Sequence, residues 1–326
     1  PTIKKGSDHF FVTTYEGNGG GQKVGNFVPF TDNGTIAKSV IFNDDDNAYL
    51  SRTNDAGDRD TFTVSVWVKR SITGAIQHIF DTYDGSSDND GYIRFNADST
   101  ISTRIGTPSS HLYTTNRTFE DTTKWYHIVL SVNTNESTAD DRVKLYIDGD
   151  LITSYSSRTN PSGGDNTQFN YASATFRVGS TTNGNYDYDG YIAEFNLVDG
   201  SALTPSTFGL TDTSTGRWIP KALTGITYGT NGHRLEFANS AGQTIGDDTS
   251  GNTNDFTVSG LATTDIVTDS PTQNFATGFH EQSDNGTITR SEGNLKVVQG
   301  QNTAKFGSMR STLILDPNDP NLYYCE

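Results

Sequence analysis

Several aspartate and asparagine side chains lie in turn-rich stretches where they could bind a cation. The candidate ligands fall in three loops: Asp81 and Asp84, Asp187 and Asp189, and Asp248, Asn252 and Asp255. Calcium takes roughly six to eight oxygen ligands, so these residue types would suit it. The same side chains also bond their own backbone in tight turns. Turn chemistry is the favoured alternative because no loop follows the EF-hand pattern, and calcium stays open as the one candidate cofactor.

Tyrosines in the same turn-rich stretches are the second group that could bind a ligand. A sugar site combines aromatic rings with a few amide or carboxylate groups that fix the orientation of the sugar. The candidate glycan-binding residues are Tyr83, Tyr92, Tyr113, Tyr186 and Tyr188. The alternative is structural, because a tyrosine at a strand end can shield the edge of a β-sheet while its hydroxyl reaches water.

The glutamates show no catalytic arrangement. A glycosidase needs two carboxyl groups flanking the scissile bond, which alternate positions of one strand can supply. The glutamates are Glu16, Glu120, Glu136, Glu194, Glu236, Glu281, Glu292 and Glu326. No two of them are close enough in sequence to share a strand face. We therefore expect no catalytic residues and no enzyme, and a polysaccharide hydrolase is the least favoured alternative.

The elements that must position these side chains are β-strands. Residues 62–68 and 143–147 alternate between apolar and polar side chains, and residues 191–197 place Tyr191, Ala193, Phe195 and Leu197 on one expected strand face. Alternation with a period of two is typical of half-buried strands. No amphipathic stretch is long enough for more than a short helix. The sequence therefore predicts an all-β protein.

Turn dipeptides separate the expected strands. Asp-Gly or Asn-Gly pairs occur at residues 84–85, 90–91, 148–149, 183–184 and 189–190. Such pairs supply the positive φ angles that tight hairpins require. Many short strands joined by such turns are typical of an antiparallel β-sandwich or jelly roll.

Changes of composition along the chain suggest four parts. Residues 1–30 are Gly-rich and are expected to form an anchoring arm, and residues 31–210 form the sandwich. Residues 211–275 are an accessory β segment packed on the sandwich, and residues 276–326 begin a further β-rich domain. Because the sequence ends on what resembles half a strand, we expect the natural chain to extend beyond Glu326 or this end to pair with a neighbour.

Composition excludes several classes of protein. The formal net charge of −16 argues against binding nucleic acid, which requires a basic surface. No run of about 18 apolar residues could span a membrane. With a single cysteine, Cys325, no internal disulfide can form, and the opening residues do not resemble a signal peptide. We therefore expect a protein made and assembled in a cytoplasm.

Two segments resemble the laminin-G/concanavalin A-like lectin family. Residues 124–131, which contain Trp125, Tyr126 and His127, are similar to the W-x-H-V strand of the family. The segment at residues 143–151, VKLYIDGDL, is similar to its L-Y-V-D-G strand. Residues 190–197, GYIAEFNL, precede an Ala-Leu-Thr-Pro stretch at 202–205, similar to G-x-I-D-E-V-R-I-Y and A-L-S. Ala193 replaces an acidic residue of the family pattern. The resemblance implies a concanavalin A-like β-sandwich with a lectin-like binding function.

A wider resemblance concerns the setting in which the protein works. The whole arrangement, with Trp218 to Lys221 in the segment WIPK, resembles lectin-like virion proteins of tailed bacteriophages. This implies a virion structural protein: a fibre, a tail appendage or a head decoration. Expected partners are other virion proteins, further copies of the chain in a trimer, and host surface carbohydrate. The alternative is a free or cell-surface adhesin that binds carbohydrate with the help of calcium.

Overall fold

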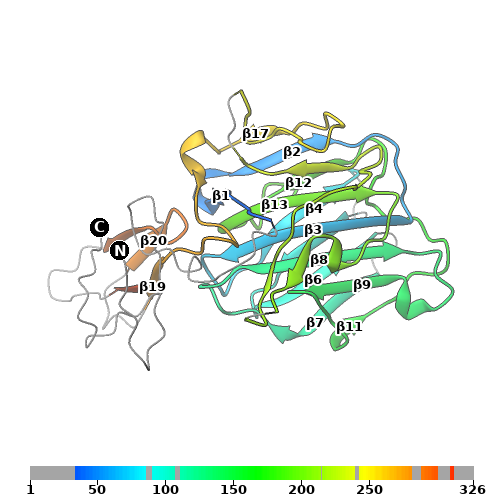
Figure 1. Ribbon diagram of the computed structural model, residues 1–326, viewed down its shortest axis with the longest axis horizontal. Helices are drawn as coiled ribbons and strands as arrows, with labels where there is room; N and C mark the ends of the chain where they lie inside the picture. The colour runs from blue at the N-terminus through cyan, green and yellow to red at the C-terminus, as the bar shows by residue number, and fades with distance from the viewer. Residues whose placement is uncertain are drawn as a thin grey trace.

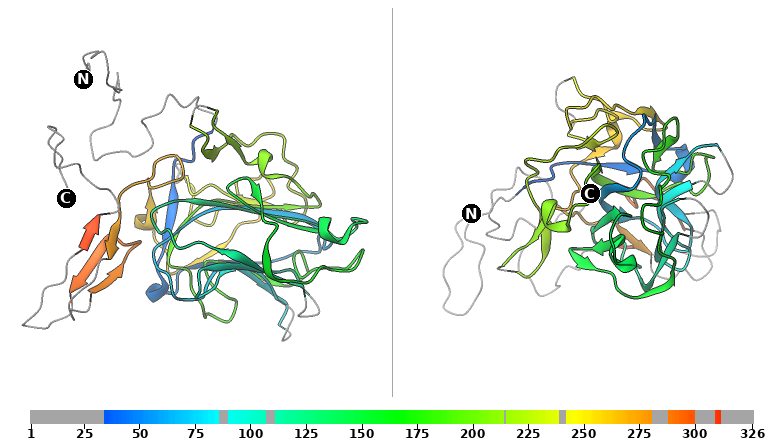
Figure 2. Two further views of the ribbon diagram at one scale, coloured as in Figure 1. Left: turned by 90° about the horizontal axis from the view of Figure 1, so that it is seen from below. Right: turned by 90° about the vertical axis from the view of Figure 1, so that its right-hand side faces the viewer.

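Two stacked β-sheets form the body of the protein, as Figure 1 and Figure 2 show. The computed structural model describes residues 34–85, 90–106, 111–213, 215–238, 242–280, 288–299 and 309–311. The expected arm at residues 1–30 lies outside the described residues, as does the chain from residue 312 to the end. Every strand pair in the described residues is antiparallel, which confirms the predicted all-β sandwich.

The first sheet, here called sheet I, carries the elements that build the candidate site. Its strands are hydrogen-bonded in the order β10-β9-β8-β3-β13-β1-β18, and β16 also pairs with β13. The bounds are β1 Ser39–Phe42, β3 Thr61–Arg70, β8 Tyr126–Asn133, β9 Val143–Ile147, β10 Asp150–Leu151, β13 Gly190–Asp199, β16 His233–Leu235 and β18 Ile266–Val267.

The second sheet, sheet II, faces sheet I and has the order β11-β7-β6-β5-β4-β12-β2-β17. Its strands are β2 Tyr49–Thr53, β4 Gln77–Tyr83, β5 Asp90–Phe95, β6 Thr100–Arg104, β7 Leu112–Thr118, β11 Tyr155–Arg158, β12 Thr175–Val178 and β17 Thr257–Ser259. Strands β16, β17 and β18 come from the expected accessory segment, so residues 211–275 contribute to both sheets. The domain boundaries themselves stay predictions.

Short elements connect and flank the two sheets. The 3-10 turns are η1 Asp44–Asp46, η2 Ala139–Asp141, η3 Pro205–Thr207 and η4 Thr263–Asp265. Three two-stranded pairs join β14 Gly209–Thr211 to β15 Trp218–Pro220, β19 Gly278–His280 to β22 Met309–Ser311, and β20 Ile288–Ser291 to β21 Lys296–Gln299. Among the residues described, no helix has the length and apolar character needed to cross a bilayer.

The hydrophobic core lies between the sheets. Phe62, Val64, Val66 and Val68 of β3 point into it, as their alternation predicts, and all four are fully buried. Aromatic rings from sheet II complete the core; the ring of Phe80, for example, stacks on a neighbouring phenylalanine with centroids 5.2 Å apart. Stacked and edge-on ring pairs of this kind add to the free energy gained from burial itself.

A bulge in β13 overturns one expected alternation. The pairing of β13 with β3 shifts register between Ala193 and Asn196, and Glu194 at the bulge has φ +48°. The extra residue reverses the side-chain direction. Phe195 and Leu197 therefore point into the core, whereas Tyr191 and Ala193 lie on the opposite face of sheet I. The prediction that these four side chains share one face is wrong for that reason.

Sheet I is buried on both faces, and this creates a third layer. Nine of the ten residues of β3 and all ten of β13 are buried. The outer face of the sheet is covered partly by residues 203–228, where Phe208 and Tyr228 pack against Val129 and Val198. It is covered elsewhere by the segment around β18, where Val267 packs with Trp67 and other side chains. A strand buried on both faces loses the apolar-polar contrast of a half-buried strand.

The C-terminal hairpins touch one edge of the sandwich (Figure 1). The Tyr191 hydroxyl donates a hydrogen bond of 2.7 Å to the carbonyl of Gly293. The Asn294 side-chain amide donates one of 2.6 Å to the carbonyl of Ser71. The turn between β20 and β21 is therefore fixed against sheet I.

Candidate functional site

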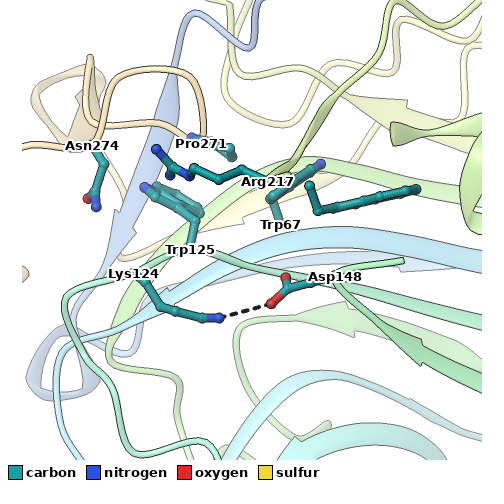
Figure 3. Close-up of a pocket in the computed structure, with 8 residues that line it drawn as sticks. Trp67, Lys124, Trp125, Asp148, Arg217, Pro271 and Asn274 are labelled. Atoms are coloured by element: carbon teal, nitrogen blue, oxygen red, sulfur yellow. Dashed lines mark hydrogen bonds and ion pairs between the residues drawn. The ribbon is translucent and has the colours of Figure 1, made fainter. Parts of the chain in front are cut away.

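A pocket with a volume of about 250 Å³ lies on the outer face of sheet I, between that sheet and the covering layer. All three tryptophans of the chain line it, together with charged and amide side chains (Figure 3). The lining residues are Trp67, Lys124, Trp125, Asp148, Arg217, Trp218, Pro271 and Asn274. A concave site that combines aromatic walls with a few convergent polar groups is typical of ligand binding.

Strand pairing and hydrogen bonds fix two of the tryptophans through a shared histidine. Trp67 on β3 lies opposite His127 on β8, and their rings stack with centroids 4.5 Å apart. The Trp218 indole N–H donates a 2.9 Å hydrogen bond to Nδ1 of His127. Because an indole can only donate, Nδ1 accepts, and Nε2 of the neutral ring donates to the Ser65 hydroxyl at 2.9 Å. Burial lowers the pKa of His127 to about 3, which keeps this ring neutral.

Two glycines make room for the ring of Trp218. A Cβ atom at Gly149 would come within 2.5 Å of the indole, and one at Gly209 within 2.6 Å. Gly149 also has φ +87°, in the left-handed region that a side chain disfavours. The Asp-Gly turn after β9 therefore does more than reverse the chain, because it provides the flat surface on which Trp218 lies.

A buried ion pair fixes Trp125 and the wall of the pocket formed by residues 266–276. The Asp269 carboxylate accepts from the Trp125 indole N–H at 3.0 Å and from the Lys69 ammonium at 2.9 Å. The Lys69 and Asp269 side chains are 1% and 7% exposed. Lys69 also donates to the Asn274 side-chain oxygen at 2.8 Å, and the Asn274 amide donates to the carbonyl of Thr123 at 2.8 Å. These bonds attach the covering segment to sheet I.

The remaining charges of the pocket lie near its opening. The Lys124 ammonium forms an ion pair of 3.0 Å with one oxygen of Asp148, whose other oxygen accepts the backbone N–H of His127 at 2.9 Å. Arg217 is exposed and extends over the pocket beside Trp125 (Figure 3). Its guanidinium group has no hydrogen-bond, ion-pair or ring partner within the described ranges of the chain.

The predicted metal ligands of the first two loops are dispersed. Asp81 is buried, and one of its oxygens accepts the backbone N–H of Thr182 at 3.1 Å. Asp84 is partly buried, and Asp187 accepts the hydroxyl of Ser180. Asp189 is 3% exposed, and burial raises the pKa of both Asp81 and Asp189 to about 7.

The third predicted metal loop is occupied by its own turn. Asp248 accepts four hydrogen bonds of 2.8–2.9 Å from donors within residues 234–254. Asn252 donates to the carbonyls of residues 229 and 232, and Asp255 accepts the backbone N–H of Asp248 at 2.8 Å. These contacts are the turn chemistry expected as the alternative. In the part of the chain that the structure describes, no three His, Cys, Asp or Glu side chains are grouped as metal ligands, and calcium stays a prediction.

The predicted glycan-binding tyrosines do not form one site. Tyr113 and Tyr188 are fully buried in the core, and Tyr83 is partly buried at the end of β4. Tyr92 and Tyr186 both contact His78 on β4. The centroid of the His78 ring is 5.0 Å from that of Tyr92 and 5.9 Å from that of Tyr186. Tyr186 is 53% exposed and Tyr92 is 5% exposed. Tyr92 is on β5 of sheet II and Tyr186 is in the loop between β12 and β13, and neither lines the tryptophan pocket.

Sequence reasoning did not identify the tryptophans as a group. The three residues are separated by as many as 151 positions, from Trp67 to Trp218, so no local motif contains them. One signal was available: tryptophan is rare in this chain, and Trp67 and Trp125 both lie in expected strands. The structure buries Trp67 and Trp125, which are 3% and 7% exposed, and leaves Trp218 half-buried.

Two glutamates that are distant in sequence meet at one arginine. Arg234 on β16 forms ion pairs of 2.5 Å with Glu194 and 2.7 Å with Glu236. Glu194 is 8% exposed, and burial raises its pKa although Arg234 opposes that shift. Both carboxylates are thus bonded to a fixed cation, an arrangement that secures β16 to the bulge of β13.

Comparisons with known proteins concern mainly the fold. No curated protein matches the sequence. The chain is similar in structure to a Bacteroides ovatus protein described as carbohydrate-binding, with 16% identity and a TM-score of 0.49; the match covers 72% of this chain and 60% of that one. It is also similar to domain 4 of the arabinanase AbnA from Geobacillus stearothermophilus, which was solved in complex with arabinotriose. That match has 22% identity and a TM-score of 0.38, and it covers 53% of this chain and 76% of that one.

A heptameric pentraxin from Limulus polyphemus gives a further match, with 16% identity and a TM-score of 0.37 over 52% of this chain and 80% of that one. Identities at this level are too low to transfer a function. The family comparison is more direct, because residues 42–207, about half of the chain, match the model of the concanavalin A-like lectin/glucanases superfamily. On the strength of that match and of the two antiparallel sheets, the chain belongs to the concanavalin A-like lectin/glucanase superfamily.

Proposed function

We propose that this protein is a non-catalytic carbohydrate-binding protein and that the tryptophan pocket holds the sugar. One observation carries the proposal: all three tryptophans of the chain converge on a single cavity that also contains charged and amide side chains. A sugar ring offers C–H groups to an aromatic face and hydroxyls to polar groups, and this pocket has both kinds of partner.

The dimensions of the pocket favour a short ligand. Pockets for drug-sized molecules usually enclose about 300–1,000 Å³, and this one encloses about 250 Å³. A single sugar residue at a chain end or branch suits that volume better than an extended polysaccharide does. The proposal of a non-catalytic role is supported by Glu194 and Glu236, which are both engaged by Arg234.

The pocket is not formed by the matched domain alone. Trp67, Trp125 and Asp148 lie within the family match at residues 42–207, whereas Arg217 and Trp218 lie beyond it. The wall at residues 271–274 also follows the match. The ligand specificity we propose therefore depends partly on segments outside the family match, placed on the outer face of the sandwich.

A glycan array probed with the full chain, followed by calorimetry on the sugars it identifies, tests the proposal. Trp218→Ala should weaken binding about tenfold or more, because loss of a well-packed aromatic contact typically costs more than about 1 kcal/mol. Tyr186→Ala is the matched control, since it removes an exposed aromatic ring far from the pocket. If Tyr186→Ala abolishes binding and Trp218→Ala does not, the site lies on sheet II and the proposal is wrong.

The same calorimetry with and without a chelator examines the calcium-assisted adhesin. Binding that disappears on addition of EDTA and returns with calcium would favour that alternative and the aspartate loops. Binding that does not change supports a metal-independent tryptophan pocket. Circular dichroism in both conditions shows whether the chelator affects the fold itself.

We further propose that the protein is a structural component of a virion, assembled in the host cytoplasm, in which the pocket faces host surface carbohydrate. Support comes from the resemblance of the WIPK segment to lectin-like phage proteins and from a chain without a cysteine pair. Mass spectrometry of purified particles should detect the chain, and light scattering should show a trimer. A strict monomer that is absent from particles would overturn this part of the proposal.

A further inference from the structure

We infer that the ligand of the tryptophan pocket carries an anionic group, the carboxylate or sulfate of an acidic sugar, and that Arg217 binds this group. The inference rests on the proposed function and names its class of ligand. Neither the family match nor the similar structures assign a role to Arg217, which follows the end of the match at residue 207.

The first line of support is that Arg217 is unpaired in a strongly acidic protein. The chain has 39 acidic and 23 basic residues, so most arginines have a carboxylate or another acceptor available. Arg158 and Arg234 form ion pairs, and Arg142 donates to backbone carbonyls. Arg217 has no such partner in the described parts of the molecule, although it lies at the opening of a pocket.

The second line of support is the balance of donors and acceptors in the pocket. The indole N–H groups of Trp125 and Trp218 already donate to Asp269 and His127. The Asn274 amide also has partners for both its oxygen and its nitrogen. The donors that remain among the lining residues are the five N–H bonds of the Arg217 guanidinium, the two N–H bonds of Lys124 that Asp148 does not accept, the Trp67 indole N–H and the second N–H of the Asn274 amide. A site rich in cationic donors suits a ligand with several anionic acceptor oxygens.

The charges on neighbouring groups leave this preference intact. Lys69 and Asp269 neutralise each other below the surface, and Lys124 and Asp148 form a pair at the pocket edge. One positive charge, that of Arg217, therefore remains uncompensated among the lining side chains. The Debye length is about 8 Å at physiological salt, so distant acidic residues do little to oppose it.

The backbone at Arg217 is well positioned to hold the side chain in place. Its carbonyl accepts the backbone N–H of Asp212 at 2.8 Å, and the N–H of Gly216 donates to the Asp212 carbonyl at 2.7 Å. Gly216 has φ +69°, which completes the turn. Trp218, the next residue, is fixed by His127. The guanidinium group therefore extends from a backbone that is fixed on both sides, by the turn before it and by Trp218 after it.

The test uses two series of matched sugars and the full chain. Each series contains a neutral hexose, its uronic acid and its 6-sulfate: galactose, galacturonate and galactose 6-sulfate, and the corresponding glucose compounds. Binding is measured by tryptophan fluorescence and by ligand-observed NMR. An acidic member should bind about tenfold or more tightly than its neutral counterpart, since charged hydrogen bonds are the stronger class. Comparison of the uronic acid with the sulfate identifies the source of the anion.

Arg217→Gln should abolish the preference for the anion, so that this variant binds the acidic sugar no more tightly than it binds the neutral counterpart. Arg117→Gln is the control, because Arg117 is an exposed arginine on sheet II. Raising NaCl from about 0.05 to 0.5 M should weaken acidic binding alone, since salt screens charge. Equal affinity for neutral and acidic sugars, or unchanged binding by Arg217→Gln, overturns this inference only. If neither series binds and the glycan array is negative, the proposed function fails with it.

Discussion

Replacing Asp269 by asparagine tests whether the ion pair beneath the pocket holds the covering layer on sheet I. The change keeps the size of the side chain and an oxygen that can accept from the Trp125 indole. It removes the negative charge opposite Lys69, whose side chain is 1% exposed. The variant therefore isolates the electrostatic contribution of a buried pair from the packing around it.

The expected loss in the free energy of unfolding is about 3 kcal/mol. Removing one partner of a buried ion pair typically costs about 3–5 kcal/mol, because the other charge is left buried without compensation. The lower end applies because Lys69 keeps two acceptors, the side-chain oxygen of Asn274 at 2.8 Å and the carbonyl of Phe275 at 3.2 Å. Burial also lowers the pKa of Lys69, so loss of its proton limits the cost further.

Urea denaturation followed by tryptophan fluorescence measures this difference. Asp141→Asn is the control, because it breaks the Lys144–Asp141 pair of 3.1 Å, whose side chains are 33% and 47% exposed. An exposed pair of this kind contributes roughly 0.2–1 kcal/mol. If Asp269→Asn costs no more than Asp141→Asn, the buried pair does not hold the covering layer in place, and the reasoning about this wall of the pocket is refuted.

Two further predictions concern the pocket and sheet II. Gly149→Ala should displace the ring of Trp218, because the new Cβ would lie 2.5 Å from that ring and residue 149 has φ +87°. We expect the free energy of unfolding to fall by about 2 kcal/mol and sugar binding to weaken. An unchanged near-UV circular dichroism spectrum would contradict this prediction. Burial raises the pKa of Asp81 to about 7, from about 3.9 in the unfolded chain. The contribution of the protonated Asp81 carboxyl group to the free energy of unfolding is therefore fully present below pH 4 and is lost as the pH rises to 7. Between pH 5 and 8 the wild type should therefore lose about 3 kcal/mol more of its free energy of unfolding than Asp81→Asn loses. Equal losses in urea titrations would show that this carboxyl group titrates normally.

Much of the fold can be predicted from local patterns. The alternation at residues 62–68 and 143–147 identifies β3 and β9, and the Asp148–Gly149 pair forms the turn that follows β9. These features are local because a strand with one apolar face records its burial in every second residue. The resemblance around Trp125 adds the sandwich class, which the family match supports.

The bulge and the third layer escape such reasoning. The reversal of side chains at Glu194 depends on an unpaired residue that no sequence pattern marks. The outer face of sheet I carries Trp67 and Tyr191, which are large and amphipathic and fit a half-exposed strand as well as a buried one. The covering segment that buries them comes from later in the chain, so sequence spacing gives no indication of the contact.

The candidate site was missed because it is assembled from distant positions. Tyr113 and Tyr188 have the residue type of a sugar contact, but both point into the core. The loop at Asp248 has the composition of a calcium site, yet hydrogen bonds within its own turn occupy its oxygens. Residue type indicates which chemistry a side chain can perform, whereas the direction in which it points depends on strand register and on contacts across the whole fold.

The split origin of the pocket suggests a way to change what it recognises. Its base is a rigid sheet, whereas two of its walls are a hairpin at residues 209–220 and a segment at residues 271–274. Exchanging these two surface pieces between relatives would alter selectivity and leave the two-sheet scaffold untouched, much as antibody loops vary on a constant framework. Under the proposed function, substitutions in these two pieces would change the ligand without changing the central packing of the two sheets.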